Sequence, residues 1–200
     1  MSRSPTSSDP GVRPCTRRFR RARAFLALAA ILPGAAGAAA FETQEQALAR
    51  AFPPPARVVR STSFLTDAQH EAARKTAQAP VDSAVVTRYA AFGPDGSLIG
   101  TAYFDAHVVR TAREVLMVVV APDRTVRSVD VLAFGEPQDY LPRGGWLKRV
   151  EGKRQEDGLF VGRALAHVTG ATLTTRAIAA AVRRVLTFHS LLGDPAPQGK

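Results

Sequence analysis

The chain contains very little sulfur and only one indole. Its 200 residues include one cysteine, Cys15, two methionines and one tryptophan, Trp146. A lone cysteine cannot form an intrachain disulfide, and it cannot supply the several thiolates of a structural zinc site. The four histidines form no spaced pair with one another or with the cysteine, so no metal site is expected.

The common signatures of nucleotide binding and of nucleophilic catalysis are also missing. The sequence has no glycine-rich dinucleotide fingerprint, no phosphate-binding P-loop and no serine nucleophile elbow. NAD(P)H is therefore not an expected direct partner. A hydrolase, which is one alternative for this chain, would lack an organised set of nucleophile, acid and base.

Negative charge is nearly absent from the first 40 residues. Seven arginines there stand against a single acid, Asp9, and a wholly apolar stretch follows from Ala24 to Leu32. Pro33 and Gly34 interrupt this run, and small residues continue to Ala40. A basic region, a short apolar region and an Ala-x-Ala site predict that residues 1–40 are a secretory signal peptide.

The alternative for this segment is an uncleaved membrane anchor. The uncharged stretch from Ala24 to Phe41 has 18 residues, the lower limit of a membrane span, but it contains a Pro-Gly pair and is rich in small residues. We therefore favour cleavage, and we expect a periplasmic or other extracytoplasmic protein. Removal of residues 1–40 lowers the net charge from +10 to +4, and the remaining basic residues are scattered, so no nucleic-acid partner is expected.

Residues 41–192 are expected to form one domain. Hydrophobic periodicity and turn signals predict strands at Val58–Phe64, Val85–Phe92, Leu98–Phe104, Val115–Ala121 and Thr125–Phe134. They predict helices at Phe41–Phe52, 67–78, Trp146–Val150, Gly162–Val168 and from near Arg176 onward. The apolar run Val115–Ala121 is typical of a central strand covered on both faces. We predict an α+β fold with a largely antiparallel sheet and flanking helices, followed by a disordered tail at 193–200.

One stretch near the C-terminal end gathers hydroxyl groups around a glycine. Residues 169–175 read Thr-Gly-Ala-Thr-Leu-Thr-Thr, and an amphipathic helix pattern follows. Gly170 permits a left-handed turn that exposes a neighbouring hydroxyl, and free N–H groups at a helix start favour a phosphate. The segment therefore predicts a threonine hydroxyl beside a phosphate site. The alternative is a plain helix N-cap, in which Thr172 or Thr174 accepts a backbone hydrogen bond.

Thr169-Gly170-Ala171-Thr172 resembles the Ser/Thr-Gly-Ala-Thr flavinylation motif of the FMN-binding domain family. That family includes subunits of the sodium-translocating NADH:quinone reductase and of the Rnf complex, and the resemblance extends over roughly the whole chain after residue 41. It implies FMN as the cofactor, joined to Thr172 through a phosphoester. It also implies cofactor contacts from the rest of the motif: Thr169, Gly170, Ala171, Leu173, Thr174 and Thr175. The family usually has an aspartate three residues before the first Ser/Thr, where this chain has Ala166.

Two further segments resemble the family's Glu-(Thr)-Pro loop and its aromatic segment ending in Gly-Lys. They are Phe134–Pro142 and Trp146–Lys153. A flavin ring needs an apolar or aromatic wall and polar contacts along its pyrimidine edge. Tyr140, Leu141 and Trp146 are candidates for the wall. Glu136 and backbone groups near Gly135 are candidates for the edge. The alternative is a surface loop whose Trp146 fills the core.

The resemblance implies an electron carrier of an oxidoreductase system rather than a stand-alone enzyme. Because a threonine hydroxyl is a weak nucleophile without a nearby base, the implied partner is a flavin transferase that loads FMN from FAD. A membrane redox protein is the expected electron donor. The alternatives are a cofactor-free assembly or interaction domain, which Ala166 favours, and a domain that binds flavin non-covalently.

Asp105 and His107 share one face of a predicted strand end because they are two residues apart. They are candidates for a proton relay to a reduced flavin. The favoured interpretation of the sequence is a solvated polar pair.

Overall fold

A five-stranded sheet forms the centre of the domain. The computed structural model describes residues 42–143 and 145–196. Its strands are β1 (Arg57–Phe64), β2 (Val85–Phe92), β3 (Leu98–Val109), β4 (Ala112–Val120) and β5 (Val126–Phe134). They lie in sequence order, and every neighbouring pair is antiparallel. The predicted α+β fold with a largely antiparallel sheet is confirmed.

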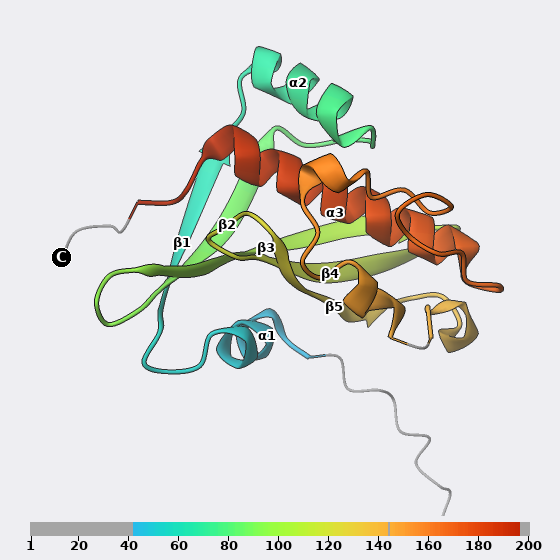
Figure 1. The fold of residues 1–200 in the computed structure, drawn as a ribbon, viewed down its shortest axis with the longest axis horizontal. Helices are drawn as coiled ribbons and strands as arrows, with labels where there is room; N and C mark the ends of the chain where they lie inside the picture. Colours follow the sequence, from blue (N-terminus) through green and yellow to red (C-terminus); the bar gives the residue numbers. More distant parts are fainter. Residues whose placement is uncertain (1–41, 144, 197–200) are drawn as a thin grey trace, which may run out of the picture. The chain divides into compact units, whose positions relative to one another are not determined.

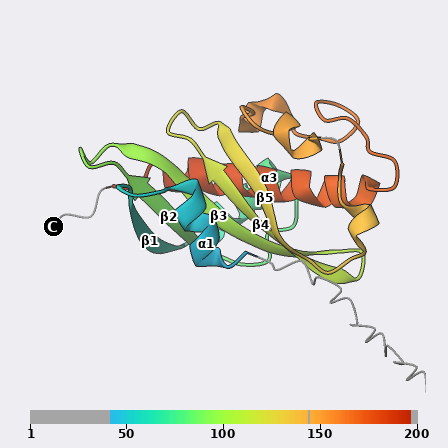
Figure 2. The same ribbon diagram turned by 90° about the horizontal axis from the view of Figure 1, so that it is seen from below.

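Helices cover both faces of this sheet. The α-helices are α1 (Gln44–Ala51), α2 (Asp67–Ala77) and α3 (Thr172–Leu192), and the 3₁₀ helices are η1 (Gln138–Tyr140), η2 (Trp146–Arg149) and η3 (Gln155–Asp157). Figures 1 and 2 show α3 along one face of the sheet, with α2 beside it, and α1 on the opposite face. Within residues 42–143 and 145–196, no helix combines the length and the apolar character that a membrane span needs.

Local sequence explains where α1 and α2 begin. Thr66 Oγ1 accepts a hydrogen bond from the Gln69 N–H at 3.2 Å, and Gln69 Oε1 accepts one from the Thr66 N–H at 2.9 Å. This is the capping box that the sequence predicted for α2, and Thr43 and Gln46 form the same arrangement at α1. α2 ends at Gln78, whose φ of +46° stops the helix.

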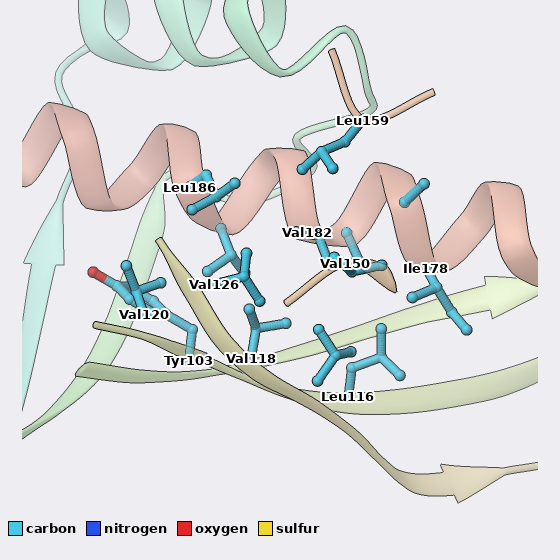
Figure 3. Close-up of a cluster of buried hydrophobic side chains, with 14 of the residues drawn as sticks. Tyr103, Leu116, Val118, Val120, Val126, Val150, Leu159, Ile178, Val182 and Leu186 are labelled. Atoms are coloured by element: carbon cyan, nitrogen blue, oxygen red, sulfur yellow. The ribbon is translucent and has the colours of Figure 1, made fainter. Parts of the chain in front are cut away.

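The apolar run in β4 lies between two hydrophobic layers. Leu116, Val118 and Val120 pack against Ile178 and Val182 of α3, in the core drawn in Figure 3. The alternate residues Met117 and Val119 pack on the other side with Ala47 and Phe52, at and just after α1. The prediction of a central strand covered on both faces is therefore confirmed.

Some element boundaries differ from the expectations. β3 and β4 are longer than predicted and meet in a two-residue turn at Arg110 and Thr111. The predicted helix at Gly162–Val168 is wrong: Gly162 has a φ of +89°, and Val161 and Leu165 form an isolated bridge. α3 begins at Thr172, four residues before the predicted start.

The two ends of the chain were predicted to be a signal peptide and a disordered tail. The predicted signal peptide, 1–40, lies outside the described residues. Residues 193–196 of the predicted tail are within the described part, where the Gly193 carbonyl accepts a 2.6 Å hydrogen bond from Arg88 and Pro195 is buried. Residues 197–200 lie outside the described part.

Candidate functional site

Three segments that are distant in the sequence meet at one end of the sheet. They are the β3–β4 turn, η1 and the first residues of α3 (Figure 1). A cavity of about 140 Å³ lies between them, lined by Arg110, Tyr140, Gly170, Thr172, Leu173 and Thr174. Five of these six residues were predicted from the sequence, and they are half of the ten predicted site residues.

The turn before α3 depends on Gly170. This glycine has a φ of +84°, and a Cβ built on it would meet nothing within 4 Å. The position therefore requires glycine for its backbone conformation and not for lack of space. The following residue, Ala171, is the N-cap of α3, and no side chain caps this helix. The alternative of a plain N-cap formed by Thr172 or Thr174 is wrong.

The uncapped start of α3 leaves backbone donors free. The N–H of Ala171 bonds to the Val168 carbonyl at 3.0 Å, and that of Thr175 bonds to the Ala171 carbonyl at 2.9 Å. Between these two residues lie Thr172, Leu173 and Thr174. Their backbone N–H groups have no hydrogen-bond acceptor among the described residues. Free N–H groups and the positive end of a 21-residue helix dipole make a favourable place for an anion.

The four threonines of the motif have different surroundings. Thr169 is exposed and does not line the cavity, while Thr174 is buried and does. Thr175 is buried, and its hydroxyl donates to the Thr172 carbonyl at 3.0 Å. Thr172 is half-buried, and its hydroxyl has only a long 3.4 Å contact to the Val168 carbonyl. Thr172 is therefore the residue of the four whose hydroxyl is weakly held, partly accessible and beside the cavity.

Arg110 and Tyr140 form the wall opposite the helix. The Arg110 guanidinium carbon lies 4.8 Å from the centre of the Tyr140 ring, a cation–π distance. No carboxylate in the described ranges forms an ion pair with Arg110. The cavity thus contains an aromatic ring and a guanidinium that has no direct ion pair among the described residues. The sequence analysis missed Arg110, because nothing in the local sequence marked the β3–β4 turn.

Glu136 holds the turn that presents Arg110. Its Oε1 accepts hydrogen bonds from the N–H of Thr111 at 2.8 Å, the hydroxyl of Thr111 at 3.0 Å and the N–H of Ala112 at 2.8 Å. The Thr111 N–H lowers the pKa of the Glu136 carboxyl, with further contributions from Ala112 and from the charge of Arg110. Glu136 does not line the cavity, so its predicted contact with the edge of a flavin ring stays a prediction.

Trp146 supports the motif from behind. Its side chain is buried in the core under α3, and its Nε1–H donates to the Ala166 carbonyl at 2.8 Å. This bond fixes the chain three residues before Thr169. Trp146 does not line the cavity. Its position is that of a tryptophan that fills the core, which was the alternative interpretation of the sequence.

Asp105 and His107 belong to a buried charged network and not to a solvated pair. His107 Nδ1 lies 2.9 Å from Asp105 Oδ1, and its Nε2 lies 2.9 Å from Glu114 Oε2. Arg184 donates two 2.7 Å hydrogen bonds to Asp105. Burial alone would lower the pKa of His107, but the two carboxylates outweigh it and raise the pKa to about 9. The favoured interpretation of the sequence was therefore wrong.

Among the described residues, no catalytic base or metal site accompanies the cavity beside Thr172. Within the described residues, the Thr172 hydroxyl has no hydrogen bond to a histidine, aspartate or glutamate. The same residues contain no group of three or more histidine, cysteine, aspartate or glutamate side chains that could hold a metal ion. The site can therefore bind an anion beside a hydroxyl, but it offers no group that activates the hydroxyl.

Comparison with known proteins identifies a family for this arrangement. Residues 113–187 match the model of the FMN-binding domain, and this span includes Tyr140 and the whole 169–175 motif. Arg110 lies just before it. No curated protein and no solved structure matches the chain. The predicted family and cofactor are confirmed for this span: residues 113–187 match the FMN-binding domain, and this domain indicates FMN as the cofactor.

Proposed function

We propose that this chain is an extracytoplasmic electron-transfer protein that carries FMN on Thr172 through a phosphoester. The observation that carries the proposal is the position of the Thr172 hydroxyl. It stands at the uncapped start of α3, in a cavity that Arg110 also lines. A phosphate ester at this oxygen would place its charge beside free backbone donors and a cation.

The residues present fit the phosphate end of the cofactor. The free N–H groups of the first turn of α3 and the guanidinium of Arg110 suit the phosphate of FMN. The Tyr140 ring offers a flat surface of the kind that contacts aromatic ligands. When bound, FMN supplies the redox chemistry, accepting and donating one or two electrons. The protein orients the cofactor and sets the charge around it.

Two residues outside the cavity act on its geometry. Glu136 holds the turn of Arg110 through three hydrogen bonds, and Trp146 holds the Ala166 carbonyl. Neither needs to touch the cofactor to affect it. They are positioning residues in this proposal, and their loss would shift Arg110 or the start of α3.

Loading would require a second protein. In the proposed reaction the Thr172 oxygen attacks the FMN phosphorus of FAD, a new O–P bond forms, and the pyrophosphate bond breaks to release AMP. The hydroxyl proton must pass to a base, and Thr172 has no such group as a hydrogen-bond partner. A flavin transferase that supplies this base is therefore the proposed partner. We also propose a membrane redox protein as electron donor, because the basic and apolar N-terminal segment favours export.

A non-covalent flavin site is the second candidate, and Ala166 favours it. This residue stands where the family usually has aspartate, which concerns attachment more than binding. Ala166 is exposed, its carbonyl is held by Trp146, and it does not line the cavity beside Thr172. The missing carboxylate therefore leaves the cavity intact. Its effect would fall on recognition by the transferase.

Two substitutions of Thr172, one that keeps its hydroxyl and one that removes it, distinguish covalent from non-covalent flavin binding. The protein is produced with a flavin transferase, precipitated with acid and examined for flavin fluorescence in a denaturing gel. Wild type and Thr172→Ser should retain fluorescence, because both have a hydroxyl at this position. Thr172→Val removes the hydroxyl at constant volume and should lose it. Covalent flavin in Thr172→Val contradicts attachment at this residue, and flavin that is released from wild type by acid favours the non-covalent candidate.

A further inference from the structure

A second and larger cavity opens where β2 and β3 separate. The ladder between these strands ends at the pair Arg88 and Tyr103, and the first residues of β2 then pair only with β1. In Figure 1 the beginning of β2 and the end of β3 lie apart. A cavity of about 600 Å³ occupies this fork, with α3 along one side. This volume lies in the range of small-molecule sites.

The two cavities are different sites. They share no lining residue, although both use α3 and the β3–β4 hairpin. Ala177, Ala180, Arg184 and Phe188 line the larger cavity from α3, and their spacing of three and four residues places them on one face of the helix. The two alanines have short side chains, so space remains between the helix and the strand.

Apolar side chains form much of the wall. Phe104 and Phe188 contribute aromatic rings from β3 and α3, and Val85 and Val108 stand at the opening. Val85 is 47% exposed and Val108 is 62% exposed. An apolar ligand would remove this surface from water.

In the polar part of the wall, the Asp105 carboxylate already accepts hydrogen bonds from protein side chains. Both oxygens of Asp105 accept hydrogen bonds, from His107 and from Arg184. Arg184 also donates from Nη1 to the Pro80 carbonyl at 2.8 Å. Each of its terminal nitrogens carries a second hydrogen, for which the described residues offer no acceptor. Glu114 has an unpartnered buried oxygen, but this residue does not line the cavity.

Arg113 adds a cation that no described residue neutralises. It lines the cavity from β4, is exposed, and forms no ion pair or side-chain hydrogen bond within the described ranges. The hydroxyl of Ser83 is bonded to the backbone of Val85, and the remaining acid of the lining, Asp82, is exposed. Arg113 and Arg184 therefore offer unused hydrogen-bond donors to a ligand in this cavity.

We propose that this cavity binds a small organic anion with an apolar body, such as an aromatic carboxylate, with its charge between Arg113 and Arg184 and its apolar part against Phe104 and Phe188. An arginine fork suits a carboxylate, because two parallel N–H groups can meet its two oxygens. The proposal does not depend on attachment of FMN at Thr172, since the two cavities share no residue.

Calorimetric titration of the full flavin-loaded chain with benzoate tests this directly. Benzamide has the same ring without the charge, and acetate has the charge without the ring. Benzoate should bind saturably and at least tenfold more tightly than either. Thr172→Val should give the same benzoate affinity as wild type, which separates this site from the proposed flavin attachment.

Two variants, Arg113→Gln and Ala180→Phe, test whether benzoate binds in the larger cavity. Arg113→Gln should weaken benzoate at least tenfold and leave benzamide unchanged. Arg127→Gln is the matched control, because Arg127 stacks over Phe52 at 5.6 Å from its ring centre, outside the cavity, and should change nothing. Ala180→Phe fills the cavity and should abolish binding, with its melting temperature measured to verify folding. Absence of saturable benzoate binding, equal binding of benzamide, or unchanged affinity in Arg113→Gln would overturn the proposal.

Discussion

The left-handed turn at Gly170 offers a quantitative test of the site geometry. An alanine at a φ of +84° would bear a conformational cost of about 1–2 kcal/mol. Replacing glycine also restricts the unfolded chain, which offsets about 0.4–1 kcal/mol. No steric contribution arises, because a Cβ at this position has no neighbour within 4 Å. Gly170→Ala should therefore lower the free energy of unfolding by about 1 kcal/mol.

Gly96 provides a matched control for this strain. It has a φ of +80° and equally open surroundings, but it lies in the turn between β2 and β3, away from the start of α3 (Figure 2). Gly96→Ala should lower stability by the same amount. A loss of about 1 kcal/mol corresponds to roughly 2–4 °C in melting temperature for a domain of this size.

Flavin content should distinguish the two variants. Gly170→Ala moves the Thr172 hydroxyl and the free N–H groups of α3, so covalent flavin per protein, measured from visible absorbance after acid precipitation, should fall severalfold. Gly96→Ala should load normally. Equal flavin content in the two variants, or an unchanged melting temperature in Gly170→Ala, would refute the reasoning from backbone conformation.

Further predictions concern the residues around the two cavities. Trp146→Phe removes the hydrogen bond to Ala166 and leaves space in the core, so it should cost more than about 1 kcal/mol in chemical denaturation; an unchanged midpoint would count against a supporting role. Glu136→Gln should reduce flavin loading without preventing folding, because an amide oxygen is a weaker acceptor for the turn of Arg110; normal loading would show that the turn does not need the carboxylate. The raised pKa of His107, about 9, means that its charged form stabilises the fold below its unfolded pKa and that this contribution is lost as pH rises through 9. Wild type should therefore lose stability from pH 7 to pH 10 more steeply than His107→Gln, and parallel curves would contradict the network.

The sequence predicted elements whose signals are local. The capping box at Thr66 and the apolar run of β4 each depend on residues close together, and both were found where expected. The clustering of Tyr140 with the 169–175 motif was also expected. That expectation came from the resemblance to the FMN-binding domain family and not from a local sequence signal.

The features that were missed depend on contacts between distant residues. The turn at Arg110 and Thr111 lacks the glycine or asparagine that marks a tight hairpin, and Arg110 adopts a φ of +55°. Glu136, 25 residues away, supplies the hydrogen bonds that this turn needs. The pairing of His107 with Glu114 could not be predicted without the register of β3 and β4.

The start of α3 was placed too late for a related reason. Sequence rules find helix starts through capping side chains, and Ala171 provides none. The same absence leaves the donors that suit a phosphate. The rule that normally locates helix starts therefore missed this uncapped one.

Peptide mapping tests the central claim most directly. Trypsin cleavage after Arg163 and Arg176 releases a peptide from Ala164 to Arg176 that contains all four threonines of the motif. In protein produced with a flavin transferase, its mass should rise by that of FMN less one water, and fragmentation should place the addition on Thr172. An unmodified peptide from a flavin-containing preparation, or an addition on another threonine, would contradict the account.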